Sequence, residues 1–109
     1  MEPLPQAKAV IIFSTMPRDQ GETIARTLVE EHLAACVNVL ETRSVFRWKG
    51  KLEREAEDLL VIKTASVRTE ELMRRIRELH PYELPEMIVI PLVGGHEPYI
   101  DWILQETAV

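Results

Sequence analysis

The sequence is poor in cysteine, in basic residues and in long apolar runs. A single cysteine among 109 residues cannot form an internal disulfide, so nothing requires an oxidising compartment. The formal net charge of −5 argues against a nucleic-acid partner, because such proteins usually carry a basic patch. The longest apolar run, residues 87–93, contains a proline and is too short to cross a bilayer, so no membrane span is expected. The first residues lack the pattern of a signal peptide, and we therefore expect a cytoplasmic protein.

The motifs of common enzyme classes are also missing. The chain has no G-x-x-x-x-G-K, G-x-G-x-x-G, G-x-S-x-G or H-E-x-x-H pattern, and its one cysteine has no obvious base beside it. Arg18 follows an expected strand, but the stretch 14–18 lacks the glycine-rich cradle that binding of an acyl phosphate would need. We therefore do not expect an enzyme.

The length and apolar content indicate one domain. The chain is 46% hydrophobic, which is enough for a sizeable core in 109 residues. Residues 1–7 contain two prolines and little apolar pattern, so we expect a flexible N-terminal arm there and a single domain over residues 8–109.

Apolar periodicity predicts four strands and three helices. Strands are expected where β-branched and aromatic residues cluster, at 9–13, 37–49, 51–64 and 87–90. Helices are expected where apolar residues recur at helical spacing, at 19–36, 69–79 and 98–104. Asp19 and Glu22 have the form of a capping box at the first helix, and Gly50 marks a turn between two long strands.

The order β-α-β-β-α-β, with one added C-terminal helix, predicts an α+β fold. Such a split βαβ arrangement gives a four-stranded antiparallel sheet with two helices on one face. Right-handed crossovers place the first and third strands in the middle, and Pro91 agrees with an edge position for the fourth. The second strand would then be a long exposed edge, so we predict that it pairs with another subunit.

The connector 80–86 carries a high density of potential ligand groups. It reads His80-Pro81-Tyr82-Glu83-Leu84-Pro85-Glu86, with two prolines that stiffen the backbone. His80 and Glu86 are the candidate metal ligands, and Tyr82 with Glu86 is expected to line a ligand pocket. The alternative is that the prolines only end a helix and start a strand, with the polar groups solvated.

Other candidate residues are aromatic or charged. Trp48, Tyr82, Tyr99 and Trp102 either line a pocket at a subunit boundary or form the core of an interface. Lys63 ends an apolar strand and needs an acidic partner or an anion, and Glu86 is the predicted partner.

Cys36 is a further pocket candidate, although a free cysteine in an apolar stretch also packs well as a small hydrophobe. His32 precedes it by four residues and would share its face on a continuing helix, as a ligand pair would. The acidic residues Glu53, Glu55, Glu57 and Asp58 could form a cation site, but a solvated hairpin face is the favoured interpretation.

Five motifs together resemble the CutA divalent-cation tolerance family. They are Leu33-Ala34-Ala35-Cys36-Val37-Asn38, Ser44-x-x-x-Trp48-x-Gly50, Ile62-Lys63-Thr64, His80-Pro81-Tyr82-x-x-Pro85-Glu86 and Tyr99-x-x-Trp102. The resemblance covers nearly the whole chain and implies a ferredoxin-like subunit in a homotrimer joined through long hairpins and edge strands. It also implies a role in tolerance to divalent metals, notably copper.

The resemblance transfers the metal site only in part. In the enteric bacterial relative the proposed copper ligands are a cysteine that ends the first strand and two adjacent histidines before Pro-Tyr. Ser14 and Leu79-His80 occupy these places here, so only His80 matches. A hydroxyl is a much poorer copper ligand than a thiolate.

Two functions follow from these observations. The first is a non-catalytic homotrimer for divalent-metal tolerance that binds ions such as copper weakly in a cleft between subunits, with no obligatory cofactor. The alternative is a signalling module of the nitrogen-regulator type, which binds a small anion in that cleft beside Lys63 and Arg18. A trimer that docks other, unknown proteins is a third reading.

Overall fold

The computed structural model describes residues 7–109. Of the predicted arm 1–7, only Ala7 lies within this range, and its carbonyl accepts a hydrogen bond from the Ser66 hydroxyl. The elements in chain order are β1 (Ala9–Pro17), α1 (Gly21–Glu30), β2 (Cys36–Trp48), β3 (Lys51–Ala65), η1 (Ser66–Arg68), α2 (Thr69–Leu79), β4 (Ile88–Pro91) and α3 (Glu97–Glu106).

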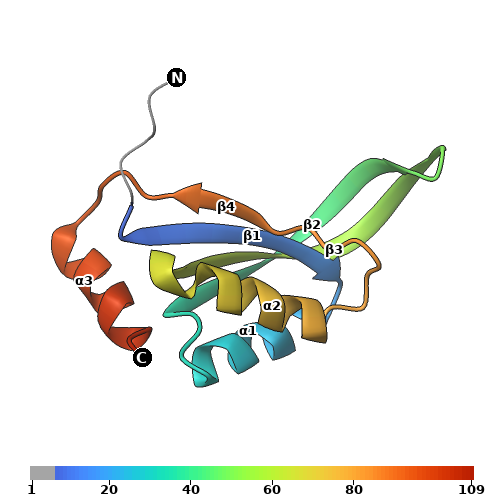
Figure 1. The fold of residues 1–109 in the computed structure, drawn as a ribbon. Helices are drawn as coiled ribbons and strands as arrows, with labels where there is room; N and C mark the ends of the chain where they lie inside the picture. Colours follow the sequence, from blue (N-terminus) through green and yellow to red (C-terminus); the bar gives the residue numbers. More distant parts are fainter. Residues whose placement is uncertain (1–6) are drawn as a thin grey trace.

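The four strands form one antiparallel sheet in the order β2-β3-β1-β4. The prediction that the first and third strands are central is confirmed, and so is the ferredoxin-like α+β class. Helices α1 and α2 lie side by side on one face of this sheet (Figure 1). The outer sides of β2 and β4 have no strand beside them among residues 7–109, because these two strands end the sheet.

The main core lies between the sheet and the two helices. Alternate residues of β1 and β3 point toward the helices, as the period of two along a strand requires. Helices α1 and α2 contribute apolar residues at helical spacing to the same layer. The buried members are Val10, Ile12, Met16, Ile24, Ala25, Leu28, Leu33, Ala34, Leu60, Ile62, Leu72 and Ile76.

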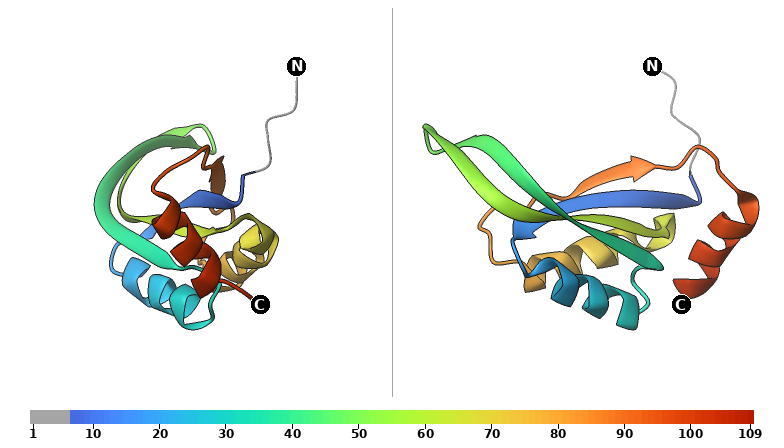
Figure 2. Two further views of the ribbon diagram at one scale, coloured as in Figure 1. Left: turned by 90° about the vertical axis from the view of Figure 1, so that its left-hand side faces the viewer. Right: turned by 180° about the vertical axis from the view of Figure 1, so that it is seen from behind.

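Helix α3 lies at the end of the sheet opposite the hairpin tip (Figure 2). Ile103 is fully buried in a second, smaller cluster with Ala9 and Ala35. Pro98 occupies the first turn of α3, where its missing N–H costs nothing, as the sequence predicted.

Strands β2 and β3 form a long hairpin that extends beyond the rest of the sheet (Figure 2). Its register runs without interruption from Cys36 opposite Lys63 to Trp48 opposite Lys51. The two turn residues both have positive φ, 50° at Lys49 and 81° at Gly50. Two such residues define the type I′ turn whose twist matches that of a hairpin. The predicted turn at Gly50 is confirmed, and Lys49 shares it.

The first helix is shorter than the sequence predicted. It ends at Glu30, and His32 then adopts a left-handed conformation with φ of 60°. The amides of His32 and Leu33 donate to the carbonyls of Val29 and Leu28, which closes the helix end. His32 and Cys36 therefore do not share a helix face, and the predicted ligand pair is wrong. The His32 ring instead donates from Nδ1 to the Glu106 carbonyl, 3.2 Å away.

Within residues 7–109, the longest helix is too short and too polar to span a membrane. The predicted cytoplasmic location stays a prediction.

Candidate functional site

The base of the hairpin is fixed to the start of α1 by Asp58. One carboxylate oxygen of this β3 residue accepts hydrogen bonds from the backbone N–H groups of Asp19, at 3.0 Å, and Gly21, at 2.9 Å. These are donors at the start of a helix that have no partner within the helix. The predicted Asp19–Glu22 capping box is wrong, because Asp19 has a φ of 76° and the cap comes from β3.

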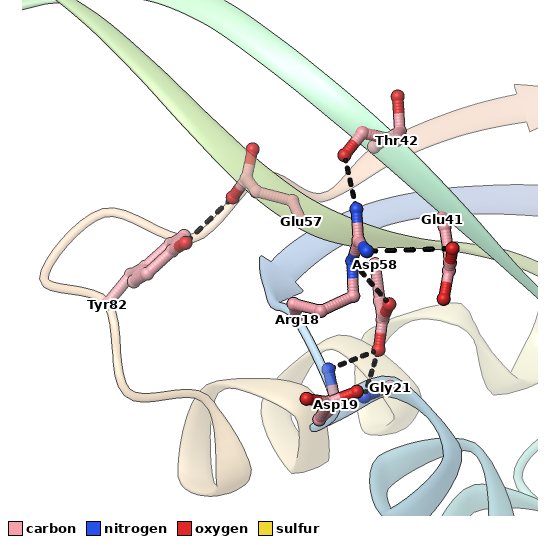
Figure 3. Close-up of polar contacts among 8 residues, drawn as sticks. All are labelled: Arg18, Asp19, Gly21, Glu41, Thr42, Glu57, Asp58 and Tyr82. Carbon is pink, nitrogen blue, oxygen red and sulfur yellow. Dashed lines mark hydrogen bonds and ion pairs between the residues drawn. The ribbon is translucent and has the colours of Figure 1, made fainter.

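Arg18 completes this polar cluster (Figure 3). Its guanidinium lies 3.6 Å from the second oxygen of Asp58 and 3.5 Å from the Glu41 carboxylate on β2. It also donates to the Thr42 carbonyl at 3.2 Å. One side chain from the β1–α1 loop thus binds both strands of the hairpin, while Asp58 keeps its charge balanced although it is buried.

Gly21 makes the close approach of α1 to the hairpin feasible. A Cβ atom at this position would lie 2.8 Å from both Cβ and Oδ2 of Asp58 and 2.9 Å from a methyl group of Val39. Real Cβ contacts are longer than this, so any larger residue would push the helix away from β2 and β3.

Glu57 lies next to Asp58 in the chain and points to the opposite face of the sheet. It is only 3% exposed, and its carboxylate accepts a hydrogen bond of 2.7 Å from the Tyr82 hydroxyl (Figure 3). Burial of the phenol and this bond to the Glu57 carboxylate raise the pKa of Tyr82 above its ordinary value. The connector after α2 is thereby attached to the hairpin.

His80 holds the start of the same connector. Its Nε2 donates to the Thr15 carbonyl at 2.7 Å, and its Nδ1 accepts from the Tyr82 amide at 3.1 Å. The ring also packs against Tyr82, with centroids 4.8 Å apart. Both ring nitrogens serve the fold, so a metal ion would have to displace one of these bonds. The metal role of His80 stays a prediction.

Trp48 and Tyr82, predicted to share a pocket, do line the same cavity. It has a volume of about 590 Å³ and lies between the part of the β2–β3 hairpin near its turn and the connector 80–86. Its remaining walls come from Pro17, Phe46, Glu53, Glu55, Ala56, Pro81, Glu83 and Leu84. Of the four acidic residues expected on a solvated hairpin face, Glu53 and Glu55 face this cavity. Glu57 and Asp58 are buried, so that expectation is wrong for them.

A second group of predicted residues lies at the other end of β2. The ammonium group of Lys63 contacts the amide oxygen of Asn38 and lies 3.8 Å from the Cys36 sulfur. Tyr99 of α3 approaches the same cysteine, and burial, together with Cys36, raises the pKa of its hydroxyl. Trp102 packs on Tyr99 with ring centroids 5.4 Å apart.

The prediction that Glu86 pairs with Lys63 is wrong. Lys63 takes its polar contacts from Asn38 and Cys36, both on the neighbouring strand β2. Glu86 is half-buried in the connector and forms no ion pair with another residue of 7–109.

The single predicted pocket is therefore two separate groups in one subunit. Cys36 and Trp48 are the first and last residues of β2, and an extended strand of that length spans roughly 40 Å. In the part of the chain that the structure describes, no three His, Cys, Asp or Glu side chains lie close enough to hold a metal ion.

Sequence reasoning missed Asp58 as a cap and Glu57 as the partner of Tyr82. The available signal was the pair of carboxylates directly before the apolar run Leu59–Ile62, since charged residues at the edge of a buried run need partners. The partners are 39 and 25 residues away in sequence, and no local pattern connects them.

The chain matches three microbial relatives over almost their whole length and five plant and vertebrate relatives over only part of theirs. The divalent-cation tolerance protein CutA of Thermus thermophilus is 38% identical over 89% of this chain and 96% of its own length. A CutA homologue of Xenopus laevis is 46% identical over 84% of this chain. The chain spans between 54% and 62% of the plant and vertebrate relatives that it matches.

The solved structure of the PII-like protein CutA from Nostoc sp. PCC 7120, in apo form, has the same fold. Its TM-score is 0.88 at 45% identity, and the match covers 90% of this chain and 96% of that one. The sequence profile of the CutA1 divalent ion tolerance protein matches residues 10–106. The chain therefore belongs to the CutA1 divalent ion tolerance family.

Proposed function

We propose that this protein acts as a homotrimer in divalent-metal tolerance and holds ions such as Cu²⁺ weakly, without catalysis, in clefts between its subunits. The single observation that carries this proposal is the face of the sheet opposite α1 and α2, which no helix covers among residues 7–109 (Figure 1). Both α1 and α2 lie on one face (Figure 1), and the strand registers place apolar residues on the other face. They are the half-buried Ile11, Phe13, Leu59 and Val61 and the exposed Leu40, Ile88 and Ile90.

This surface favours association with further copies of the chain. The exposed apolar residues continue to the two edge strands, whose outer backbone groups lack a strand partner within residues 7–109. An apolar face next to open sheet edges is usually covered in native proteins. A second copy can cover it. The edge strands β2 and β4 run in opposite directions in the same sheet, so the edge of one copy can pair with the edge of another.

The ligand geometry supports a site between subunits rather than within one. Three or more side-chain ligands are needed for tight metal binding, and no such group lies together within residues 7–109. His80 and Glu86 would each contribute at most part of a site, and a second subunit would have to supply the rest. Such a shared site would be weak, because His80 would first have to leave Thr15 or Tyr82.

Sedimentation analysis of the purified protein tests the assembly. We expect a species of three chains of 12.6 kDa each. Ile88→Lys, on the uncovered face, should shift the protein to monomers, because it would bury a charge in the contact. Val67→Lys is the matched control, since Val67 is exposed in η1 and lies off the sheet. A monomeric parent, or equal effects of both substitutions, would contradict the proposal.

Calorimetric titration with Cu²⁺ tests the metal site. The parent trimer should give saturable heat, and the monomeric Ile88→Lys variant should give none. Glu86→Gln should weaken binding while the trimer persists, because it removes a charged ligand without a change of size. His80→Ala should remove the heat. Saturable binding to the monomer would place the site within one subunit and contradict the shared cleft.

Lys63 favours a second candidate function, the binding of a small anion in the manner of a PII-like signalling protein. Its ammonium group forms no ion pair with a carboxylate among the residues that the structure describes. Within one subunit Arg18 contacts Asp58, Glu41 and Thr42, and its expected place in a cleft between subunits stays a prediction.

A thermal-shift screen with nucleotides and small carboxylates tests this candidate. A ligand of this kind should raise the Tm of the parent protein and leave that of Lys63→Met unchanged. Lys8→Met serves as a control for the loss of one positive charge. A screen in which no compound changes the Tm would count against the anion-binding function.

A further inference from the structure

The part of the β2–β3 hairpin near its turn carries an arginine-rich patch that consists of Val45, Arg43, Arg47 and Arg54. All four residues are exposed. Arg54 is opposite Val45 in the register, and the other two arginines lie two positions to either side of Val45, so the four side chains share one face. This face of the strands is the one to which Leu60 contributes in the core, and not the face that the proposed trimer covers.

The patch has no partner of opposite charge in its own chain. None of its three arginines forms an ion pair with a carboxylate within residues 7–109. Residues 43–54 contain five basic residues and one acidic residue, whereas the whole chain has a net charge of −5. The rest of the chain is therefore strongly acidic, and a second copy is a partner of complementary charge. Arginine is moreover enriched in protein interfaces, where lysine is depleted.

An acidic hollow lies at the other end of the molecule, beside α3 (Figure 2). It has a volume of about 340 Å³ and is enclosed by the start of β1, the loop after β4 and α3. Glu97 and Asp101 are four residues apart on α3 and so lie on one face of the helix. Neither forms an ion pair with another described residue, and Lys8 also lines the hollow. Its apolar walls include Pro91, Leu92, Val93 and Ile100.

We propose that the arginine-rich patch of one chain docks on the acidic hollow of the next, with Val45 in the hollow and the arginines beside Glu97 and Asp101. The two surfaces are different, so the contact is heterologous, and such contacts generate a ring when the rotation closes. The patch also lies on the strand β2, whose outer edge belongs to the proposed assembly. The inference rests on the proposed trimer and adds the surfaces that join its neighbouring chains.

Charge reversal on both surfaces tests the contact. Arg47→Glu with Arg54→Glu should raise the concentration at which the trimer half-dissociates by about tenfold, because like charges would then face each other. Glu97→Lys with Asp101→Lys should have the same effect. The variant with all four substitutions should return to within about threefold of the parent, because the opposite charges are exchanged and not lost. Sedimentation of each variant over a dilution series measures the dissociation.

Arg74→Glu with Arg77→Glu is the matched control for the hairpin variant. These two arginines are exposed on α2, form no ion pair within residues 7–109, and give the same change of charge. Their reversal should leave the dissociation unchanged. A substitution that only disturbed the hairpin would not be rescued by changes on α3, so the recovery of the fourfold variant identifies a direct contact.

Disulfide trapping locates the same contact. In a Cys36→Ser background, Val45→Cys with Val93→Cys should link neighbouring chains under mild oxidation, which a denaturing gel shows as species of up to three chains. The hairpin and α3 lie at opposite ends of one chain, so a bond within a chain cannot form (Figure 2). Each single cysteine variant should stay unlinked.

Absence of the rescue, or of the cross-link, in a trimeric parent would overturn this contact while the trimer stands, and would leave the patch to a partner other than a second copy. Equal effects of the hairpin variant and its α2 control would also overturn it. A monomeric parent would overturn both the trimer and this contact.

Discussion

The inner and outer halves of the β2–β3 hairpin share one uninterrupted register but have different environments. From Cys36 to Thr42, β2 is opposite Lys63 to Glu57, and on the β3 side Glu57 is buried and residues 58–63 alternate between buried and half-buried. Beyond Glu57 toward the tip, no residue of β3 is buried. The backbone pairing is the same in both halves, so the difference lies in what covers the side chains.

Charged residues mark the boundary between the two halves, and neither strand contains a glycine or proline. Two successive carboxylates, Glu57 and Asp58, are fixed on opposite faces of β3 by groups from two different loops. Arg18 adds a link to β2. A strand can therefore extend beyond the core with its pairing intact, provided that long-range polar contacts fix the residues where the buried part ends.

The largest expected difference comes from one substitution made in each half. Leu60→Ala opens a cavity at a fully buried position and should lower the free energy of unfolding by about 3 to 5 kcal/mol. Leu52, on the same strand, is 72% exposed, so Leu52→Ala should change it by less than about 0.5 kcal/mol. Urea unfolding at one protein concentration measures both. Similar losses of unfolding free energy in the two variants would show that the outer half is also buried and would contradict the difference between the halves.

Loss of Asp58 should have the next largest effect. Asp58→Ala leaves the start of α1 without its acceptor and Arg18 without its buried partner, so we expect a loss of about 3 kcal/mol. Asp58→Asn keeps an acceptor for the amides and should lose less. Urea unfolding of the two variants beside the parent measures this ranking. Full stability of Asp58→Ala would mean that the boundary does not depend on this carboxylate.

A methyl group at Gly21 tests the close contact of α1 with the hairpin. Gly21→Ala should cost about 1 to 3 kcal/mol, because the new Cβ would overlap Asp58 and Val39. Gly94→Ala is the matched control, since a Cβ there meets no atom within 4 Å. Thermal unfolding of both variants gives the comparison. An unchanged Tm for Gly21→Ala would show that the helix can shift without loss.

The smallest expected effect is at the connector. Tyr82→Phe removes the bond to Glu57 and should lower stability by about 1 kcal/mol near neutral pH. The folded-state pKa of Tyr82 is raised, so its contribution is complete below the ordinary pKa of 10.0 and is lost as the pH rises above it. The difference in stability between the parent and Tyr82→Phe should therefore shrink in that range.

Ultraviolet titration of the native protein checks the same point. The chain has two tyrosines, and the pKa values of both Tyr82 and Tyr99 are raised. Native protein should therefore show little tyrosinate at pH 10, and unfolded protein should show about half of its tyrosine ionised. Ionisation of Tyr82 at its ordinary pKa in the native protein would contradict the buried contact with Glu57.

The sequence by itself determined the elements, their order and the family. The periods of apolar residues defined the strands and helices, Pro91 indicated an edge strand, and the order of elements left one plausible sheet. These features are local, because the apolar period of a strand or helix can be recognised within a short run of consecutive residues. The end of α1 was misplaced, because the left-handed turn at His32 has no glycine to mark it.

Only the tertiary structure decided which polar residues meet. Asp58 caps α1, Tyr82 binds Glu57, and Lys63 lies beside Cys36 and not beside Glu86. The tertiary structure also separated the residues of the single predicted pocket into two groups, one at each end of β2. Such contacts join residues from distant parts of the chain, and they depend on strand register and sheet twist. No spacing in the sequence encodes them, because a polar side chain finds its partner only after the apolar core has placed both backbones.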